Sequence, residues 1–213
     1  MSRELTLLPP DCLVKTGPVD YAEWNYSKSI LSRIQRRRFQ MAKSLLGEQR
    51  YGKLLEIGYG SGIFMPELAA RCDRLYGLDI HEHSGEVTHA LSTQGIIAEL
   101  TTASAEEMPY EDQFFDCIVA VSALDFVPDI ARAAREAHRI LAPGGHFIVV
   151  MPAVSAIVDL GLYLLTGNSA KEDFGDRREK VAPALRQYFK IEKSLNFPPM
   201  LRPRLYQAWR MIK

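Results

Sequence analysis

The sequence has no excess of either charge, few cysteines and no apolar run long enough to cross a membrane. Its 26 basic and 26 acidic side chains give a formal net charge of +0, so no global field attracts nucleic acid or an anionic surface. The three cysteines lie far apart, which argues against a disulfide framework and favours free thiols in a reducing compartment. No basic segment followed by an apolar stretch marks a secretory signal, and we expect a soluble cytoplasmic protein.

Repeats and low-complexity tracts are also missing, and 213 residues with 47% hydrophobic content fit one domain with a full-sized core. We expect a lead-in and cap helix over residues 1–47, a ligand-binding core over 48–152, and a cover segment with a C-terminal hairpin over 153–213. In the core, short apolar runs alternate with helical patterns. This alternation predicts an α/β fold with a parallel sheet and helices on both faces.

The expected elements follow from hydrophobic periodicity and from the glycines and prolines between them. Helices are predicted over residues 26–46, 63–72, 86–94, 130–141 and 177–188, the last with a possible break at Pro183. Strands are predicted over residues 53–57, 75–78, 96–100, 117–121, 146–151, 189–196 and 205–212. An apolar segment over 153–166 is expected to cover the site, and 168–176 is expected to be a polar loop.

The most informative stretch is residues 54–62, L-L-E-I-G-Y-G-S-G, where an apolar strand runs into a glycine turn and then a helical pattern. Glycine accepts positive φ and lets a ligand approach the backbone closely. Backbone N–H groups and a helix N-terminus therefore converge, which favours a polar or anionic ligand. Ile63 stands where a dinucleotide loop, G-x-G-x-x-G, needs a third small residue, so the spacing disfavours that class. A glycine turn without a ligand is the alternative.

With Glu56 in front, this E-x-G-x-G-x-G stretch resembles motif I of the class I S-adenosylmethionine-dependent methyltransferases. The resemblance implies that Glu56 orders the loop or reaches the cofactor's amino group through water. Asp79 ends the next apolar run about 20 residues after the glycines and matches the family's ribose-binding acid, although an Asp at a strand end is commonly a cap or turn residue. The implied cofactor pocket includes Gly58, Tyr59, Gly60, Gly62 and Ile80.

Two further segments resemble the family in the right order. Residues 102–110 resemble its adenine-contacting segment, G-D-A-E-x-L-P-F, with Ser104 where an Asp is common. A hydroxyl accepts a weaker hydrogen bond than a carboxylate, so the Ala105 N–H or the Glu106 acid is expected to help, unless Glu106 is a solvated loop acid. Residues 141–151 resemble the family's L-K-P-G-G-x turn, in which we expect Pro143 to end the preceding helix.

Candidate catalytic groups follow the strand at 117–121, because ligands of open α/β sheets bind outside the C-terminal ends of the strands. Many relatives have histidines here, as in L-H-H-V-P-D, whereas this chain has Asp125 and Phe126. Asp125 is the candidate general base or acceptor-orienting group, and its alternative role is a cap. Ser122 is expected beside the sulfonium region. Tyr26, or second Tyr21, is expected near the methionine end, with ordinary packing as the alternative.

Other polar groups are harder to assign. Residues 36–38, Arg-Arg-Arg, form either a solvated helix face or a contact for a phosphorylated or carboxylated acceptor. His81 and His83 lack partners at metal-ligand spacing, and we expect no metal.

The resemblance implies a doubly wound, Rossmann-like sheet of seven strands in the order 3-2-1-4-5-7-6 with strand 7 antiparallel, as in methyltransferase type 11 enzymes of the ubiquinone/menaquinone-biosynthesis kind. It implies in-line methyl transfer from S-adenosylmethionine to a small-molecule acceptor, with S-adenosylhomocysteine as product, by a monomer or homodimer. The sequence lacks the N/D-P-P-Y/F motif that would suggest a nucleic-acid acceptor. The alternatives are a non-catalytic S-adenosylmethionine-binding protein and an NAD-dependent oxidoreductase, which Ile63 disfavours.

Overall fold

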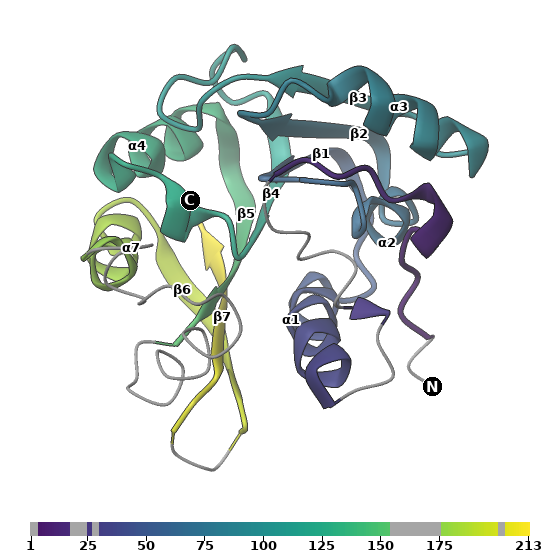
Figure 1. The fold of residues 1–213 in the computed structure, drawn as a ribbon. Coiled ribbons are helices and arrows are strands. Elements are labelled where there is room, and N and C mark those ends of the chain that lie inside the picture. Colours follow the sequence, from purple (N-terminus) through teal and green to yellow (C-terminus); the bar gives the residue numbers. More distant parts are fainter. Residues whose placement is uncertain (1–3, 18–24, 27–29, 154–175, 200–202) are drawn as a thin grey trace.

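The computed structural model describes residues 4–17, 25–26, 30–153, 176–199 and 203–213 (Figure 1). They contain a seven-stranded sheet in the order β3-β2-β1-β4-β5-β7-β6. The strands that pair from β3 to β5 are parallel, and β7 is antiparallel to both β5 and β6. The predicted fold class, strand order and antiparallel strand 7 are confirmed. The strands are β1 (Tyr51–Ile57), β2 (Cys72–Asp79), β3 (Ala98–Thr102), β4 (Phe115–Val121), β5 (Leu141–Pro152), β6 (Lys190–Phe197) and β7 (Tyr206–Ile212).

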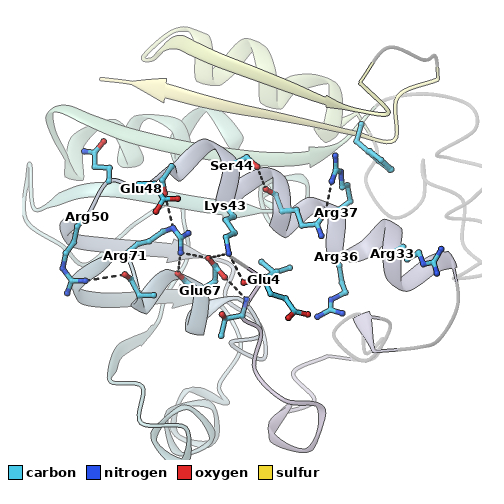
Figure 2. Close-up of a pocket in the computed structure, with 17 residues that line it drawn as sticks. Glu4, Arg33, Arg36, Arg37, Lys43, Ser44, Glu48, Arg50, Glu67 and Arg71 are labelled. Atoms are coloured by element: carbon cyan, nitrogen blue, oxygen red, sulfur yellow. Dashed lines mark hydrogen bonds and ion pairs between the residues drawn. The ribbon is translucent and has the colours of Figure 1, made fainter. Parts of the chain in front are cut away.

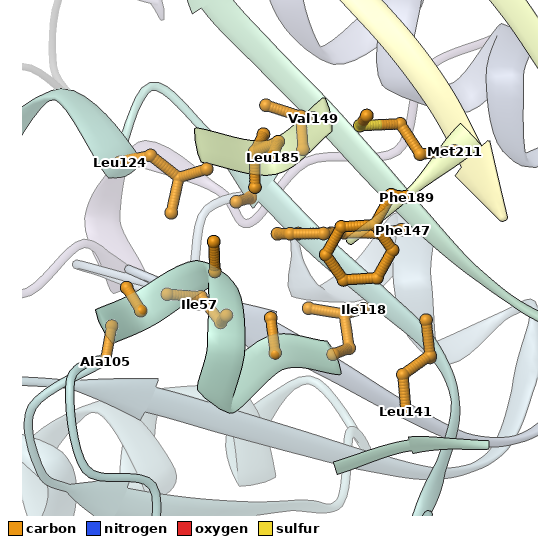
Figure 3. Packing of buried hydrophobic residues seen from close by; sticks show 14 of the residues in the cluster. Ile57, Ala105, Ile118, Leu124, Leu141, Phe147, Val149, Leu185, Phe189 and Met211 are labelled. Atoms are coloured by element: carbon orange, nitrogen blue, oxygen red, sulfur yellow. The ribbon is translucent and has the colours of Figure 1, made fainter. Parts of the chain in front are cut away.

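Helices cover both faces of this sheet (Figure 1). The described helices are α1 (Ile30–Leu46), α2 (Met65–Ala69), α3 (Ser84–Thr93), α4 (Ile130–Ile140) and α7 (Arg177–Arg186), with short 3-10 turns η1 (Pro10–Cys12) and η3 (Leu124–Phe126). Successive residues of a strand point to opposite faces, so Leu54 packs with α1, α2 and α3 while Leu55 packs with α4 and α7. Figure 3 shows the second cluster, where Phe147 and Phe189 meet edge to face at 5.3 Å.

The central strands decide where a ligand can bind. β1 pairs with β2 on one side, Leu54 opposite Leu75, and with β4 on the other, Leu54 opposite Cys117. The chain therefore winds outward from β1 in both directions. Ligands of open α/β sheets bind where the two windings part, so the binding site is expected at the C-terminal ends of β1 and β4.

Several predicted boundaries are wrong. The helix expected over 63–72 is only Met65–Ala69, because Cys72 already pairs with Tyr51 as the start of β2. Pro143 does not end the preceding helix: α4 ends at Ile140, since Leu141 pairs with Phe115 as the start of β5.

The other differences concern helix ends. Tyr26 lies in a turn before α1, whose described part begins at Ile30. Pro183 lies inside α7 without ending it, and α7 stops at Arg186 instead of residue 188. Residues 154–166, most of the loop over 168–176, and Tyr21 lie outside the described residues. Within the described ranges, no helix has the length and apolar character needed to cross a membrane.

Candidate functional site

The glycine loop after β1 adopts the backbone that the sequence predicts. Gly58, Gly60 and Gly62 have φ values of +73°, +52° and +73°, which other L residues adopt only with strain. A β-carbon at Gly58 would also lie 2.3 Å from the Cβ of Ala123, in the segment after β4. The loop therefore touches the segment that the sequence assigns to the methyl acceptor.

Asp79, at the end of β2, organises this loop. Its Oδ2 accepts a hydrogen bond from the backbone N–H of Gly60 at 2.8 Å, and its Oδ1 accepts one from the N–H of Ile80 at 2.7 Å. A carboxylate oxygen has two acceptor positions, so both oxygens can accept further hydrogen bonds from a ligand. The sequence predicts both the glycine loop and Asp79 as parts of the site, and the fold brings the two together.

The side chains around Asp79 differ in exposure. Tyr59 is buried beneath the loop, and burial, with the Asp79 charge in support, raises the pKa of its phenol. Its ring meets that of His81 edge to face at 4.9 Å, and His81 Nε2 lies 3.0 Å from the carbonyl oxygen of Gly60. Ile80 is 74% exposed and offers an apolar surface at the edge of the site. His81 braces the loop, a role the sequence does not predict.

Glu56 and Arg38 influence each other electrostatically next to the loop. Glu56 is only 3% exposed, and its Oε2 has no hydrogen-bond partner among the described residues. Burial raises the pKa of Glu56 well above its usual value, Asp79 raises it further, and Arg38 opposes the rise. Arg38 reaches the same region from α1, where its Nε atom is covered and also lacks a partner within the described ranges. Covered polar atoms without hydrogen bonds are unfavourable, so the carboxyl group of Glu56 and the guanidinium of Arg38 fit a ligand that carries both signs of charge.

From the sequence, Arg38 belongs to a basic run that forms either a solvated helix face or a contact for a phosphorylated or carboxylated acceptor, and its place near Glu56 is not predicted. Helical spacing contains the missing signal. Arg38 is four residues after Ile34 and four before Ala42, which is fully buried, so it lies on the core side of α1. Burial accordingly lowers the pKa of its guanidinium, against the charges of Tyr206 and Glu56.

The segment after β3 lies beside Asp79, because the N–H of Ala103 donates to the carbonyl oxygen of Asp79 at 2.9 Å. Ser104 is exposed, and its Oγ accepts from the N–H of Glu106 at 3.1 Å. Ala105 is buried at 6% exposure. The Glu106 carboxylate accepts from the N–H of Asp129 at 2.8 Å, at the start of α4, where a negative charge is favourable. Glu106 thus connects this segment to α4.

The segment after β4 contains a strained residue and a buried acid. Ser122 has a φ of +54°, and such backbone strain concentrates at functional sites. Asp125, in η3, is 1% exposed, and its Oδ1 has no hydrogen-bond partner in the part of the chain that the structure describes. Burial raises the pKa of Asp125 to about 7, while the charge of Arg178 opposes the rise. Asp125 is therefore a carboxyl group that can take up or release a proton near neutral pH.

Tyr26 fastens the N-terminal segment over the site. Its hydroxyl donates a hydrogen bond to the carbonyl oxygen of Leu8, and the N–H of Leu8 donates to the carbonyl oxygen of Ile63 at 2.9 Å. Leu8 is fully buried, and Thr16 lies close to Gly60. This contact between the lead-in and the glycine loop is not predictable from local pattern. Among the described residues, no three His, Cys, Asp or Glu side chains are grouped to hold a metal ion.

This sheet order, with a glycine loop after β1 and an acid at the end of β2, is the arrangement that the resemblance to the S-adenosylmethionine-dependent methyltransferases implies. Residues 55–149 match the model of a family described as "Methyltransferase domain". Over this stretch the chain therefore resembles a methyltransferase domain, and the seven-stranded sheet around it agrees with that resemblance.

Two curated relatives illustrate the sequence similarity. The chain is 31% identical over 150 residues to the ubiquinone/menaquinone biosynthesis C-methyltransferase UbiE of Bartonella quintana, which covers 64% of this chain and 58% of that protein. It is 33% identical over 98 residues to the sterol 4-C-methyltransferase strm-1 of Caenorhabditis elegans, which covers 45% of this chain and 29% of that protein. The chain thus spans less than two thirds of the length of either relative.

A solved structure supports the fold. The N-methyltransferase NodS from Bradyrhizobium japonicum, in complex with S-adenosyl-l-homocysteine, superposes with a TM-score of 0.66 at 19% identity and covers 92% of this chain and 93% of that chain.

The residues present fit S-adenosylmethionine, the cofactor that the resemblance implies. Its amino-acid end carries an ammonium and a carboxylate, and Glu56 Oε2 and Arg38 Nε are covered atoms without hydrogen-bond partners among the described residues. Asp79 has acceptor positions for the ribose hydroxyls, and exposed Ile80 offers apolar contact for the adenine ring.

Proposed function

We propose that this chain transfers the methyl group of S-adenosylmethionine to a small organic molecule by in-line displacement, and that Asp125 accepts the proton that the acceptor loses. The observation that carries this proposal is the state of Asp125. It is buried, one of its oxygens is unpartnered within the described residues, and its pKa is raised to about 7. A base works best when its pKa lies near the working pH, because it is then both available and strong enough.

The environment of Asp125 supports this role. Ser122 and Ala123 precede it, and Ala123 lies against Gly58 of the glycine loop. The carboxyl group therefore follows directly on the segment that borders the cofactor loop. The charge of Arg178 on α7 limits the rise that burial causes in the pKa of Asp125. Nη2 of Arg178 donates a hydrogen bond to the carbonyl oxygen of Ala153, just after β5, at 2.6 Å.

The remaining residues of the site bind the cofactor and orient it. Glu56 and Arg38 hold the amino-acid end of the cofactor, Asp79 holds the ribose, and Ala105 and Ile80 border the adenine. The bound cofactor supplies a methyl group on a positively charged sulfur, a leaving group that needs no further activation. The chain's own contribution is then to align the acceptor, exclude water and receive the proton.

A small organic acceptor is supported by the two curated relatives, whose names refer to a sterol and to ubiquinone and menaquinone biosynthesis. The charge balance agrees, since the chain has no net positive charge for a nucleic acid. The alternatives are a protein that binds the cofactor without catalysis and an NAD-dependent oxidoreductase.

Calorimetry with S-adenosylhomocysteine and with NAD separates the cofactor classes. We expect the sulfur ligand to bind and NAD to show no heat. Tight NAD binding with no response to S-adenosylhomocysteine would overturn the proposal.

Turnover is then tested with S-adenosylmethionine and a panel of phenols, quinols, sterols and amines, by release of S-adenosylhomocysteine. With an acceptor in hand, Asp125→Asn should lower kcat by about 10²- to 10⁴-fold and leave S-adenosylhomocysteine affinity unchanged. Asp112→Asn, at an exposed carboxylate paired with Arg139, is the control. Equal turnover in the two variants would remove Asp125 from the chemistry, and no transfer to any acceptor would favour the non-catalytic alternative.

A further inference from the structure

An open groove of about 970 Å³ runs along the outer side of α1 (Figure 2). It is separate from the cofactor site, because Arg50, just before β1, and Arg71, just before β2, line it, whereas the glycine loop lies at the opposite ends of these strands. Its lining includes six Arg or Lys residues and three Glu residues. Helix α1 contains five Arg or Lys residues and no Asp or Glu, in a chain whose formal net charge is +0.

The cations of one half of the groove serve the fold. Lys43 and Arg71 both contact Glu67 Oε1, at 3.0 and 2.5 Å, and this carboxylate is almost completely buried. Arg50 pairs with Asp73 at 2.7 Å. In Figure 2 the dashed contacts converge on Glu67. These side chains are neutralised in place and need no further partner.

The arginines in the other half of the groove have no such carboxylate partners. Arg33, Arg36 and Arg37 are spaced i, i+3 and i+4, so they lie on one face of α1. None of the three forms an ion pair with a carboxylate in the described ranges, and Figure 2 shows no dashed contact on Arg33 or Arg36. Like charges at this spacing destabilise a helix by a few tenths of a kcal/mol, roughly. Folding therefore does not explain this cluster of three.

Two of these guanidinium groups are nevertheless held in position. Arg37 Nη1 donates to Gln40 Oε1 at 2.9 Å, and its Cζ lies 5.3 Å from the ring centre of Phe197 on β6. Arg36 Cζ lies 5.9 Å from the ring centre of Tyr26. A guanidinium that stacks on an aromatic ring keeps its N–H groups available for an anion and loses less freedom on binding.

We propose that Arg33, Arg36 and Arg37 form a binding site for a phosphate-bearing ligand. The planar fork of a guanidinium matches two phosphate oxygens at once, and three forks on one helical turn suit a compact phosphate group. The phosphate comes from a lipid headgroup or from a soluble phosphate ester, which present the same chemistry. A nucleic acid is disfavoured, because the unpaired cations that line this groove are confined to about one turn of α1 and the chain has no net positive charge.

The test uses the full chain with two probes. One is inorganic pyrophosphate, measured by calorimetry. The other is co-sedimentation with vesicles of phosphatidylcholine alone or with added phosphatidylglycerol. The variant Arg33→Gln/Arg36→Gln/Arg37→Gln removes the site, and Arg74→Gln/Arg132→Gln/Arg135→Gln removes the same charge from exposed positions elsewhere.

We expect the variant that lacks Arg33, Arg36 and Arg37 to bind a probe about tenfold or more weakly than wild type does. The control variant should keep the wild-type affinity for that probe. Binding to phosphatidylglycerol vesicles alone identifies a lipid headgroup, and pyrophosphate binding without vesicle binding identifies a soluble ester. S-adenosylhomocysteine binding, at the separate cofactor site, reports that the variant is folded. If the triple variant is not folded, the double variant Arg36→Gln/Arg37→Gln replaces it.

Three outcomes would overturn the proposal. The first is no binding of either probe by wild type. The second is an equal loss in the two triple variants, which would reduce the effect to net charge. The third comes from a control with single-stranded RNA: binding that is tighter than to both probes and that depends on the same three arginines.

Discussion

The backbone N–H of Gly60 donates a 2.8 Å hydrogen bond to Oδ2 of Asp79, so the residue assigned to the ribose also shapes the glycine loop. The other oxygen of Asp79 accepts from the N–H of Ile80 at 2.7 Å. A hydrogen bond to a charged group contributes about 1.5–3 kcal/mol, and its loss leaves a backbone donor unpaired. Cofactor affinity and loop geometry are therefore coupled through one carboxylate.

Asp79→Ala should weaken S-adenosylhomocysteine binding by about 10- to 100-fold, because both the ribose contact and the loop support are lost. It should also lower the melting temperature. Asp73→Ala, on the same strand at an exposed position, should change neither property. Calorimetry and thermal unfolding measure the two effects. Equal affinities in the two variants would contradict the assignment of Asp79.

Arg38→Met should reduce affinity for S-adenosylhomocysteine by about tenfold and leave adenosine binding unchanged, because adenosine lacks the amino-acid end that Arg38 is assigned to hold. Arg37→Met, at the neighbouring exposed position on α1, is the matched control and should bind both ligands as wild type does. If Arg38→Met weakens both ligands equally, Arg38 supports the fold and has no ligand role.

Gly58→Ala should destabilise the chain and weaken S-adenosylhomocysteine binding, since the added methyl group would lie 2.3 Å from the Cβ of Ala123 and φ is +73°. Adding Ala123→Gly removes the clash but not the backbone strain, so the double variant should recover part of the stability. Urea unfolding of the two single variants and the double variant measures the coupling. Simple additivity of their effects would show that these two segments do not touch in solution.

The pH dependence of turnover should follow Asp125. Its pKa is raised from 3.8 to about 7 by burial, so the proton-accepting form grows as pH rises, and kcat/KM should increase to a plateau above about pH 7. Asp125→Asn should flatten this limb of the profile as well as lower turnover. A wild-type profile without a limb near pH 7 would contradict the role of Asp125 as base.

The same shift has a consequence for stability. The folded state favours protonated Asp125, so this group stabilises the fold fully below its unfolded pKa, and the contribution is lost as pH rises through about 7. The melting temperature of wild type should therefore fall more between pH 5 and 8 than that of Asp125→Asn. Thermal unfolding across this range measures the difference, and parallel curves would show that the pKa of Asp125 is not raised in solution.

Local pattern was sufficient for much of the fold. Alternation of apolar runs with helical spacing predicts the β strands and the helices between them, and the positive φ values of Gly58, Gly60 and Gly62 follow from residue type. The pairing of Asp79 with the loop follows from parallel topology, which brings the C-terminal ends of β1 and β2 to one edge.

Contacts distant in sequence could not be predicted this way. Helix α2 is short because Cys72 pairs with Tyr51 as the first residue of β2. The Glu106 carboxylate accepts a hydrogen bond at the start of α4, because the N–H of Asp129 has no partner within the helix. The lead-in crosses the site because Leu8 finds a partner in Ile63. Each depends on a partner at least 20 residues away.

The sequence by itself was enough to predict the class of ligand, because glycine spacing is a local requirement of close backbone approach and the acid after the next strand matches the ribose-binding acid of the family that the chain resembles. Tertiary structure decided what the charged side chains do. It divides one basic run, because the Nε atom of Arg38 is covered while Arg36 and Arg37 line the outer groove. It also covers Asp125, so that the pKa of this carboxyl group lies near neutrality. The physical reason is that burial, and with it the strength of a charge, is a property of the packed chain and not of any residue alone.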